Sequence, residues 1–479
     1  MNNITISPAE ENTLLELEES HFIDLKSSRI APASLQKHFV AFANTDGGEI
    51  YVGIEDKKVT GERIIGFDKP ESANDIVQVL MTATKPSVEG VDWEFINFGN
   101  RGLVLHISVP KSAHLHYTTS DECYIRVNAS TKKIIGEAIT KLAYAKGTYN
   151  YEKVVVPEVD IENITGSAYL ASYMERIGTT QESTIFLRKQ KLLSKVDESY
   201  RPTVGSILLF DEEPQASLNT RCAIKVYRLQ TTEREYKREY LKQAPSTIEG
   251  PIEQQITQVI QKVQELLQDV EYSVAGKLVK LVYPDETLHE ILVNAVIHRD
   301  YSVNDDIHVR VYDNRIEVLS PGKLPGYITP RNYLEERYAR NPNLVRMLHK
   351  LPNPVNHDIG EGLNTASNAM KKAGLVAPVL MELDNAVVLT IEHRRIASLV
   401  DIIREYLEDH ETVSNKLIRE ISGEDSENKV KKAFEKLRGN GEIEPVDPDA
   451  SRFKYEYRKV NRSDNGTSGL GQTVPNSLT

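Results

Sequence analysis

Apolar and polar residues alternate in short runs over the first quarter of the chain. Between about residues 19 and 135, the runs HFIDLK, EIYVGIED, LVLHISVP and YIRVNAS have the two-residue period of half-buried strands, and helical stretches separate some of them. The pattern predicts one α+β domain over residues 1–135.

The hydrophobic pattern then changes several times. Residues 136–202 have a mostly helical pattern and predict a helical connector. A buried strand is expected next, in RPTVGSILLFDEEP, within a second α/β domain at residues 203–395. This domain has a long helical pattern from Pro251, a second apolar helix, the strands DIHVRVYD and RIEVLS, and a closing strand NAVVLTIEH. Residues 396–460 predict three short helices and a hairpin, and the polar residues 461–479 predict disorder.

The second apolar helix, EILVNAVIHRDY, carries an unexpected row of polar residues. Glu290, Asn294 and His298 are spaced i, i+4 and i+8, so they lie along one helix face. A buried carboxylate or amide without a partner costs about 1–3 kcal/mol. A bound magnesium ion and water would supply partners; the alternative is that the row faces solvent.

Glycines follow this helix at two places. Pro321 and Gly322 in SPGKLPG suit a tight turn, and Gly360 and Gly362 precede an amphipathic helix. The free N–H groups and the dipole at a helix start favour phosphate. Together with Glu290 these features form a constellation that favours a phosphate-containing ligand, and the chain has no G-x-x-x-x-G-K-[ST] phosphate loop as an alternative.

The segments HEILVNAVIHRDYS, DNRIEVLSPGKLP and ARNPNLVRML, with GEGLNTASNAMKKAGL after them, resemble the GHKL, or Bergerat-fold, ATPases. They resemble more closely the divergent GHKL module of prokaryotic Schlafen AlbA-type regulators, over Thr203–Arg394. The resemblance implies an α/β sandwich that binds ATP and Mg²⁺. Because GHKL proteins often dimerise, it also implies a homodimer.

The same resemblance assigns roles to individual residues. Glu290 corresponds to the catalytic base that activates water, and Asn294 to the magnesium ligand. The implied cofactor-binding residues of the two glycine boxes are Ser320, Gly322, Gly360 and Gly362. Ser320 stands where the usual box has an aspartate that holds the adenine amino group, and a serine cannot make the same charge-assisted hydrogen bond.

Carboxylates recur at the start of the chain. If the strand that contains Asp24 and the strand that ends at Glu55 and Asp56 are neighbours, carboxylates converge there. The alternative is that Asp24 pairs with Lys26 or a nearby arginine, and that Asp56 belongs to a solvated turn.

FANTDGG, followed by GIEDK and later YIRVNAST, resembles the Schlafen AlbA-type domain over Leu14–Ile135. Some Schlafen proteins cut RNA with three carboxylates, and the resemblance places Glu19, Asp24 and Asp56 at these catalytic and metal-binding positions. Asp24 is shorter than the glutamate more common there. The candidate contacts to nucleic-acid phosphates are Arg126, Lys132 and Lys133.

Residues 396–460 resemble a winged helix-turn-helix domain. Lys429, Lys432 and Lys436 recur at i, i+3 and i+7 on its third helix and are candidate nucleic-acid contacts. The net charge of −12 argues against a wholly basic nucleic-acid coat, so binding to DNA or RNA must use a local patch.

Composition fits a reducing, aqueous compartment. Cys123 and Cys222 match no paired metal-ligand spacing, and no apolar run approaches the roughly 20 residues of a membrane span. We therefore expect a cytoplasmic protein with no membrane partner.

The combined prediction is an α+β multidomain protein with an AlbA-like Schlafen domain, a GHKL-type module and a winged helix. Its predicted function is an ATP-binding, nucleic-acid-binding regulator, transcriptional in role, in which the nucleotide site controls the flanking domains. The alternative is a metal-dependent Schlafen-like nuclease, in phage defence, under the same control. A third hypothesis is a nucleotide sensor that never hydrolyses ATP.

Overall fold

The computed structural model describes residues 2–58, 61–268, 270–274, 277–280, 282–355, 362–393, 399–422, 426–447 and 456–460. The chain forms two compact units, Met1–Arg394 and Arg395–Thr479. Gly360 and the tail at 461–479, for which binding and disorder were predicted, lie outside the described residues.

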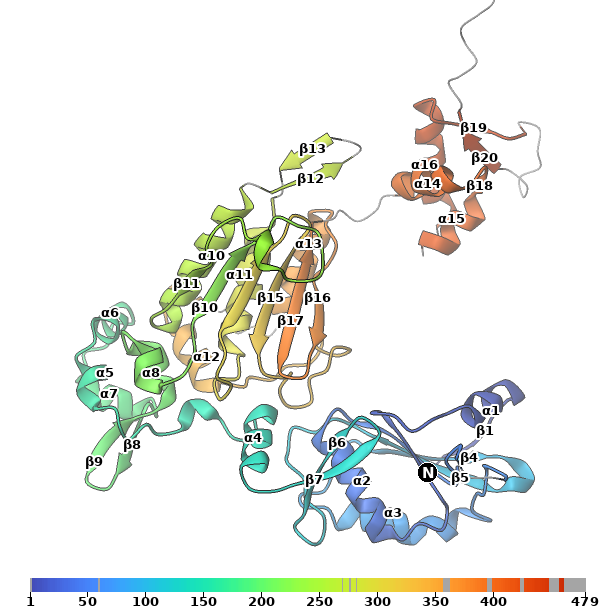
Figure 1. Ribbon diagram of the computed structural model, residues 1–479, viewed down its shortest axis with the longest axis horizontal. Coiled ribbons are helices and arrows are strands. Elements are labelled where there is room, and N and C mark those ends of the chain that lie inside the picture. Colours follow the sequence, from blue (N-terminus) through green and yellow to red (C-terminus); the bar gives the residue numbers. More distant parts are fainter. Residues whose placement is uncertain are drawn as a thin grey trace, which may run out of the picture. The chain divides into compact units, whose positions relative to one another are not determined.

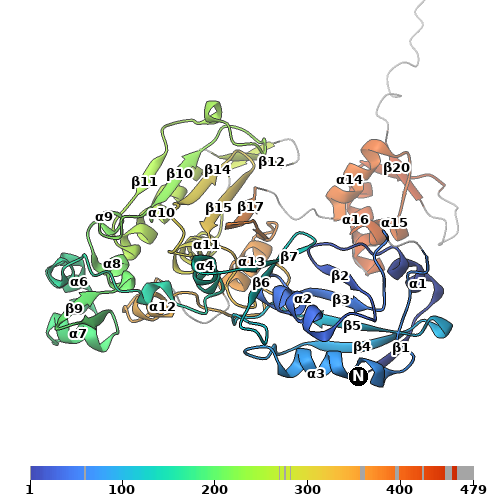
Figure 2. The same cartoon turned by 60° about the horizontal axis from the view of Figure 1, so that its bottom comes forward.

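The first part of unit 1 contains a five-stranded mixed sheet in the order β1-β4-β5-β3-β2 (Figure 2). Strands β2 and β3 are parallel, as are β1 and β4, and the other neighbours are antiparallel. The strands are β1 (Asn2–Thr5), β2 (Ile23–Lys26), β3 (Gly48–Val52), β4 (Asp92–Asn97) and β5 (Leu103–Val109). The four strand-like runs quoted from this region correspond to β2, β3, β5 and the later strand β6 (Cys123–Val127).

One face of this sheet is buried under two helices, which explains the alternating sequence. Ile50 and Val52 of β3 point into a core with Phe39 and Phe42 of the helix α2, whereas Glu49 lies on the opposite, half-exposed face. The helices of this region are α1 (Pro8–Leu15), α2 (Pro32–Asn44), α3 (Asn74–Thr82) and the short 3₁₀ turns η1 (Pro70–Ala73) and η2 (Gly99–Arg101). Strand β6 pairs with β7 (Ser130–Ile134) in a separate hairpin that packs on α2.

Residues 137–218 form helices and one unpredicted hairpin. The elements of this stretch are α4 (Glu137–Lys146), η3 (Tyr151–Lys153), α5 (Ile161–Thr165), α6 (Ala168–Arg176), α7 (Ser183–Lys189), β8 (Leu193–Val196), β9 (Ser199–Pro202), α8 (Val204–Phe210) and α9 (Pro214–Leu218). The strand predicted in RPTVGSILLFDEEP is wrong, because this stretch forms the helix α8. All seven residues of α8 are buried, and a short run buried on every side has no periodicity that separates helix from strand. The Thr203 side chain caps α8 by accepting from the Ser206 amide.

The rest of unit 1 is a six-stranded sheet in the order β11-β10-β14-β15-β17-β16. Helices α10, α11 and α13 pack against one of its faces (Figure 1). The strands are β10 (Ile224–Arg228), β11 (Ser246–Ile248), β14 (Ile307–Val311), β15 (Arg315–Pro321), β16 (Val379–Glu382) and β17 (Ala386–Glu392). The other elements are η4 (Arg238–Tyr240), α10 (Ile252–Leu267), the hairpin β12 (Glu271–Val274) and β13 (Lys277–Lys280), α11 (Asp285–Ile297), α12 (Pro342–His349) and α13 (Gly362–Lys372). The strands predicted from DIHVRVYD, RIEVLS and NAVVLTIEH are β14, β15 and β17.

The described residues of unit 2 form three helices and a small sheet in the order β18-β20-β19. The elements are α14 (Leu399–Asp409), β18 (Val413–Ser414), α15 (Asn415–Ser422), α16 (Glu427–Gly439), β19 (Ile443–Pro445) and β20 (Glu456–Lys459). Ile403, Ile418 and Phe434, one from each helix, meet in its core. Within the described ranges of both units, no helix is both long enough and apolar enough to cross a membrane.

Candidate functional site

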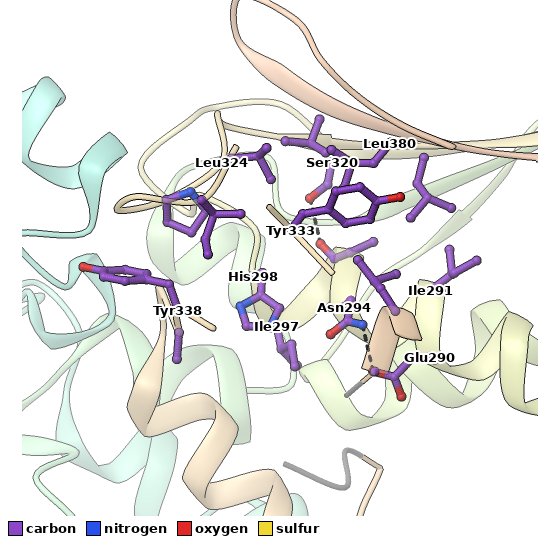
Figure 3. Close-up of a pocket in the computed structure, with 18 of the residues that line it drawn as sticks. Glu290, Ile291, Asn294, Ile297, His298, Ser320, Leu324, Tyr333, Tyr338 and Leu380 are labelled. Atoms are coloured by element: carbon purple, nitrogen blue, oxygen red, sulfur yellow. Dashed lines mark hydrogen bonds between the residues drawn. The ribbon is translucent and has the colours of Figure 1, made fainter. Parts of the chain in front are cut away.

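A pocket of about 510 Å³ lies in the central part of unit 1, between α11, the start of α13 and the strands β15, β16 and β17 (Figure 3). Most of its wall is apolar, and polar side chains reach it from both ends. Glu290 and Asn294 line one end, and Ser320 and His298 lie further along α11 and β15. An apolar pocket of this size with a few convergent polar groups is typical of small-molecule sites.

One hydrogen bond joins the Glu290 and Asn294 side chains across one turn of α11. The Asn294 Nδ2 group donates to Glu290 Oε1 at 2.8 Å, and both side chains are half-buried. The Asn294 amide oxygen is therefore turned away from Glu290 (Figure 3). This leaves Asn294 Oδ1 and Glu290 Oε2 as acceptors that a ligand can use.

The start of α13 lies directly beside this pair. A Cβ atom at Gly362 would be 1.7 Å from Glu290 Oε1 and 3.1 Å from Asn294 Nδ2, so only glycine fits here with Glu290 in place. The next three residues of α13 also line the pocket. The first N–H groups of a helix lack intrahelical partners and favour an anion, so this end of the pocket suits phosphate.

Ser320 lies on β15 at the opposite side of the pocket. Its hydroxyl donates to the Ala295 carbonyl of α11 at 2.7 Å, which consumes its only hydrogen. Towards a ligand Ser320 Oγ can therefore only accept. Gly322, two residues later, has a φ of +100° and its Cβ would lie 2.3 Å from the Asp300 Cβ, so the backbone and packing require glycine there whether or not a ligand binds.

His298 faces the pocket at the end of α11 (Figure 3). Its Nδ1 atom is buried without a hydrogen-bond partner among the described residues. Burial, together with the nearby charge of Arg340, lowers the pKa of His298 to about 4. The imidazole is therefore neutral at physiological pH.

The sequence did not predict the remaining wall of the pocket. Tyr333 and Tyr338 lie between β15 and α12, and the loop from Lys323 to Ile328 follows β15. Tyr338 fits between two glycines, because a Cβ at Gly147 or Gly326 would be 2.7 Å or 2.6 Å from its ring. These residues lie in irregular segments, whose pattern of apolar positions carries no period to identify them.

The carboxylates near the start of the chain differ from those of the pocket, because the Asp24 side chain is buried. The Asp24 side chain is 1% exposed and makes ion pairs with Lys26 at 3.1 Å, His38 at 2.9 Å and Arg126 at 2.9 Å. Burial alone would raise its pKa, but the His38 hydrogen bond and the surrounding positive charges lower the pKa of Asp24 to about 2. The alternative prediction was that Asp24 pairs with Lys26 or a nearby arginine. The structure shows it paired with both Lys26 and Arg126.

Glu19 and Asp56 do not complete a metal site with Asp24. Glu19 accepts from Lys26 Nζ at 2.7 Å, and Asp56 accepts from the Lys58 amide in a turn. Across the described ranges, no three His, Cys, Asp or Glu side chains are arranged to hold a metal ion. Among the described residues the three carboxylates are therefore not gathered into a cluster, and Lys26 lies between Glu19 and Asp24.

Arg126 is also placed differently from its prediction. It is 2% exposed, donates to the Ser20 and Ile23 carbonyls at 2.9 Å, and lies over the Phe42 ring. A phosphate cannot reach it, so its positive charge neutralises Asp24 instead. Lys132 is exposed, and Lys133 pairs with Glu122 at the surface.

The three lysines predicted to contact nucleic acid in unit 2 share the solvent face of α16. Lys429, Lys432 and Lys436 are exposed, while Val430 and Phe434 of the same helix are buried. Ser426 caps the helix by accepting from the Lys429 amide. These three lysines therefore lie on the surface of unit 2, outside its core.

Comparisons with known proteins find two regions of similarity. Residues 19–135 match the family model described as Schlafen, AlbA_2. Residues 304–391 match the model described as putative ATP-dependent DNA helicase recG C-terminal. This second range contains Ser320, Gly322 and Gly362, and Glu290 and Asn294 precede it.

No curated protein matches the chain. A crystal structure of the DIP2311 protein from Corynebacterium diphtheriae aligns with 94% of this chain and 96% of that chain, at 20% identity and a TM-score of 0.40. By its two family matches, the chain combines a region similar to Schlafen AlbA_2 domains with an ATPase-like region similar to the recG C-terminal family.

Proposed function

We propose that the chain is an ATP-binding regulator that binds nucleic acid, and that nucleotide in the pocket of unit 1 controls this binding. One observation carries the proposal: the Glu290–Asn294 pair and the start of α13 meet at one end of a cavity of about 510 Å³. A hydrophobic filling between these elements would have excluded a ligand there.

The residues at this end fit a magnesium nucleotide. Mg²⁺ prefers oxygen ligands and keeps several of its waters, so the Asn294 amide oxygen can hold it together with phosphate oxygens. Bound magnesium would neutralise phosphate charge. The N–H groups at the start of α13, where Gly362 stands, would donate to the same phosphates.

Glu290 would orient a water molecule for attack on the terminal phosphate. Its Oε1 atom is held by Asn294, which leaves Oε2 to accept a proton from water. This division of roles makes a testable difference: Asn294 affects binding, whereas Glu290 affects hydrolysis.

Ser320 remains compatible with adenine although it replaces the aspartate. Since its hydrogen is donated to the Ala295 carbonyl, its oxygen accepts from a ligand N–H group. The adenine amino group supplies such a donor. The hydrogen bond is neutral and so weaker than one to a carboxylate, and we expect lower selectivity for adenine than an aspartate gives.

Nucleic-acid binding is the second half of the proposal. The match to Schlafen AlbA_2 supports it for residues 19–135, with Lys132 and Lys133 as candidate contacts. We infer that unit 2 is a winged helix whose α16 contacts DNA through Lys429, Lys432 and Lys436, in a transcriptional role. Its three helices, small sheet and exposed lysine face support this assignment. Homodimerisation stays a prediction, which light scattering tests.

Isothermal titration calorimetry tests the nucleotide site directly. ATP, GTP and ADP are titrated in magnesium into the full chain and into Glu290→Gln. We expect calorimetry to show that both proteins bind ATP. A separate phosphate-release assay should show that Glu290→Gln no longer hydrolyses it. The absence of heat with every nucleotide would reject the site, whereas ATP binding with phosphate release at background in both proteins would favour a sensor that does not hydrolyse ATP.

Fluorescence anisotropy with labelled DNA and RNA tests the nucleic-acid half. We expect binding by the full chain and a change in affinity when ATP and magnesium are added. Replacing Lys432 with alanine is expected to lower the slope of log affinity against log salt by about 0.9 for duplex DNA. Lys431→Ala is the matched control, since Lys431 lies 3.9 Å from Glu435 on the same helix. Equal salt slopes for the two variants would reject α16 as the DNA contact.

A further inference from the structure

One wall of the pocket is an irregular loop, from Gly322 to Ile328, that follows β15. Gly322, Lys323, Leu324 and Ile328 all line the pocket. Because the loop lies outside the sheet, its position depends on hydrogen bonds to other parts of the chain. The amides of Gly322, Leu324 and Gly326 donate to Asn385, Glu382 and Lys146, respectively, at 2.8–3.0 Å.

The Schlafen-matching region supplies a side chain that holds this loop. Lys111, two residues after the end of β5, donates from Nζ to the carbonyls of Leu324 and Ile328, both at 3.0 Å. The Lys111 side chain is 7% exposed, and Glu382 Oε2 lies 3.7 Å from its Nζ. A buried ammonium that spans two loop carbonyls fixes their separation, since a charged donor strengthens each hydrogen bond.

A second lysine joins the same groups from the loop itself. The Lys323 Nζ atom lies 3.6 Å from Asp46 and 3.7 Å from Glu382. Asp46 belongs to the FANTDGG segment of the Schlafen-matching region, and Glu382 to the ATPase-like region. Two lysines and two carboxylates, one of each from either region, therefore meet beside the pocket wall.

The helix α4 holds the loop from another direction. The Gly326 amide donates to the Lys146 carbonyl at the end of α4, and the Tyr338 hydroxyl donates to the Gly147 carbonyl at 2.9 Å. Arg340 donates to the Tyr144 carbonyl and pairs with the buried Asp300. The pocket wall is thus attached to segments that precede the ATPase-like region by more than 150 residues.

The contacts continue into the first sheet. Asp46 Oδ2 lies 2.9 Å from His21 Nε2, and His21 is two residues before β2. The neighbouring Ser20 and Ile23 carbonyls hold Arg126, which neutralises Asp24. Contacts therefore run from Lys323 through Asp46 to His21, just before β2, which is the edge strand of the Schlafen-matching sheet.

We infer that Lys111 is a positioning residue for the pocket, and that it links nucleotide binding in the ATPase-like region to nucleic-acid binding in the Schlafen-matching region. The inference rests on the proposed function for the identity of the two ligands. Coupling between two sites is reciprocal, so nucleotide and nucleic acid change each other's affinity by the same factor. Without Lys111, the loop from Gly322 to Ile328 becomes more mobile, and the factor by which each ligand changes the affinity for the other approaches one.

Hydrogen exchange of the ligand-free full chain tests the positioning role alone. In Lys111→Met, which keeps the aliphatic stem, peptides covering Gly322–Ile328 are expected to exchange about tenfold faster than in the wild type. Lys111→Arg is expected to restore most of the protection. The control is Lys85→Met, because Lys85 is a half-exposed lysine of the same region that pairs with Asp121.

Nucleotide titrations and anisotropy test the linkage. We expect ATP to bind Lys111→Met at least about tenfold more weakly, because two hydrogen bonds from a charged donor are lost. We also expect ATP to stop changing the affinity for labelled nucleic acid. The partly exposed Lys323→Met is the second variant if Lys111→Met does not fold, and it is expected to reduce the coupling factor.

The two proposals fail in different ways. If the wild type binds no nucleotide, the proposed function fails, and the exchange rates still decide whether Lys111 positions the loop. If the wild type binds ATP, while Lys111→Met matches Lys85→Met in loop exchange, ATP affinity and coupling, the inference is overturned and the nucleotide site stands.

Discussion

Asp24 is a buried carboxylate and Glu290 a half-buried one, and their surroundings differ in one decisive respect. Asp24 is enclosed by Lys26, His38 and Arg126, which neutralise it within the protein. Glu290 has an uncharged amide, Asn294, as its partner and lies at the wall of a cavity. The first arrangement is complete without a ligand, whereas the second leaves charge and oxygen acceptors available.

This difference shows how to separate a structural carboxylate from a candidate site. A buried carboxylate paired with cations is strongly coupled to folding, because removing one partner leaves the others as uncompensated charges. A carboxylate in a cavity can be altered with less effect on folding and more on binding. The following predictions test whether the two regions divide in this way.

The largest expected effect is on stability at Asp24. Asp24→Asn leaves Lys26 and Arg126 without their shared carboxylate, and we expect a loss of about 3–5 kcal/mol in the free energy of unfolding. Urea denaturation followed by circular dichroism measures it. Asp56→Asn is the matched control and should cost about 0.5 kcal/mol or less. A stable Asp24→Asn protein would show that Asp24 is free for another role, and manganese-dependent RNA cleavage lost in that protein would revive the nuclease hypothesis.

At Asn294 the effect should be on ligand affinity. Asn294→Leu removes the amide oxygen proposed for magnesium while keeping a similar volume, and we expect ATP to bind about 10–100-fold more weakly. Calorimetry in magnesium measures the affinity, and denaturation should show a much smaller loss of stability than for Asp24→Asn. The exposed Asn163→Ala is the control. Equal ATP affinity in the two variants would place the metal elsewhere.

Gly362→Ala should alter the geometry of Glu290 without removing it. The added Cβ cannot coexist with Glu290 Oε1 at 1.7 Å, so the carboxylate must move from its position beside Asn294. Because the clash is with the end of a flexible side chain at a cavity wall, we expect a loss of about 1 kcal/mol or less in stability, and phosphate release falling about tenfold or more through misplacement. A Cβ at Gly439 of α16 meets no atom within 4 Å, which makes Gly439→Ala the control. Normal phosphate release by Gly362→Ala would mean that Glu290 is not the base.

The smallest expected effect is the pH dependence due to His298. Its pKa of about 4 in the folded chain is below the usual 6.5, so between these values the unfolded chain binds a proton that the folded chain does not. The contribution of His298 to the free energy of unfolding is therefore nearly constant above about pH 7. It falls as the pH drops towards 4, by about 1 kcal/mol between pH 7 and pH 5.5. His298→Gln should lose this part of the pH dependence in denaturation experiments. An identical pH dependence in the two proteins would mean that water or a ligand reaches the imidazole.

Local sequence predicted the parts of the fold that have a clear period. The alternation around Ile50 predicted β3, and the apolar runs around Val309, Val318 and Leu389 predicted the strands of the second sheet. Val204–Phe210 was misassigned because a segment buried on all sides has the same composition as a strand or a helix. The hairpins β8–β9 and β12–β13 were not predicted.

The sequence by itself determined that Glu290 and Asn294 share a helix face and that glycine stands where α13 begins, because these relations are local and follow from helix geometry. Only the tertiary structure decided that Asp24 is neutralised by Arg126 and that Lys111 holds the wall of a pocket more than 200 residues away in sequence. Such contacts depend on how sheets and loops pack together. The identity of a residue specifies the charge it brings, and the packing specifies which partner that charge meets.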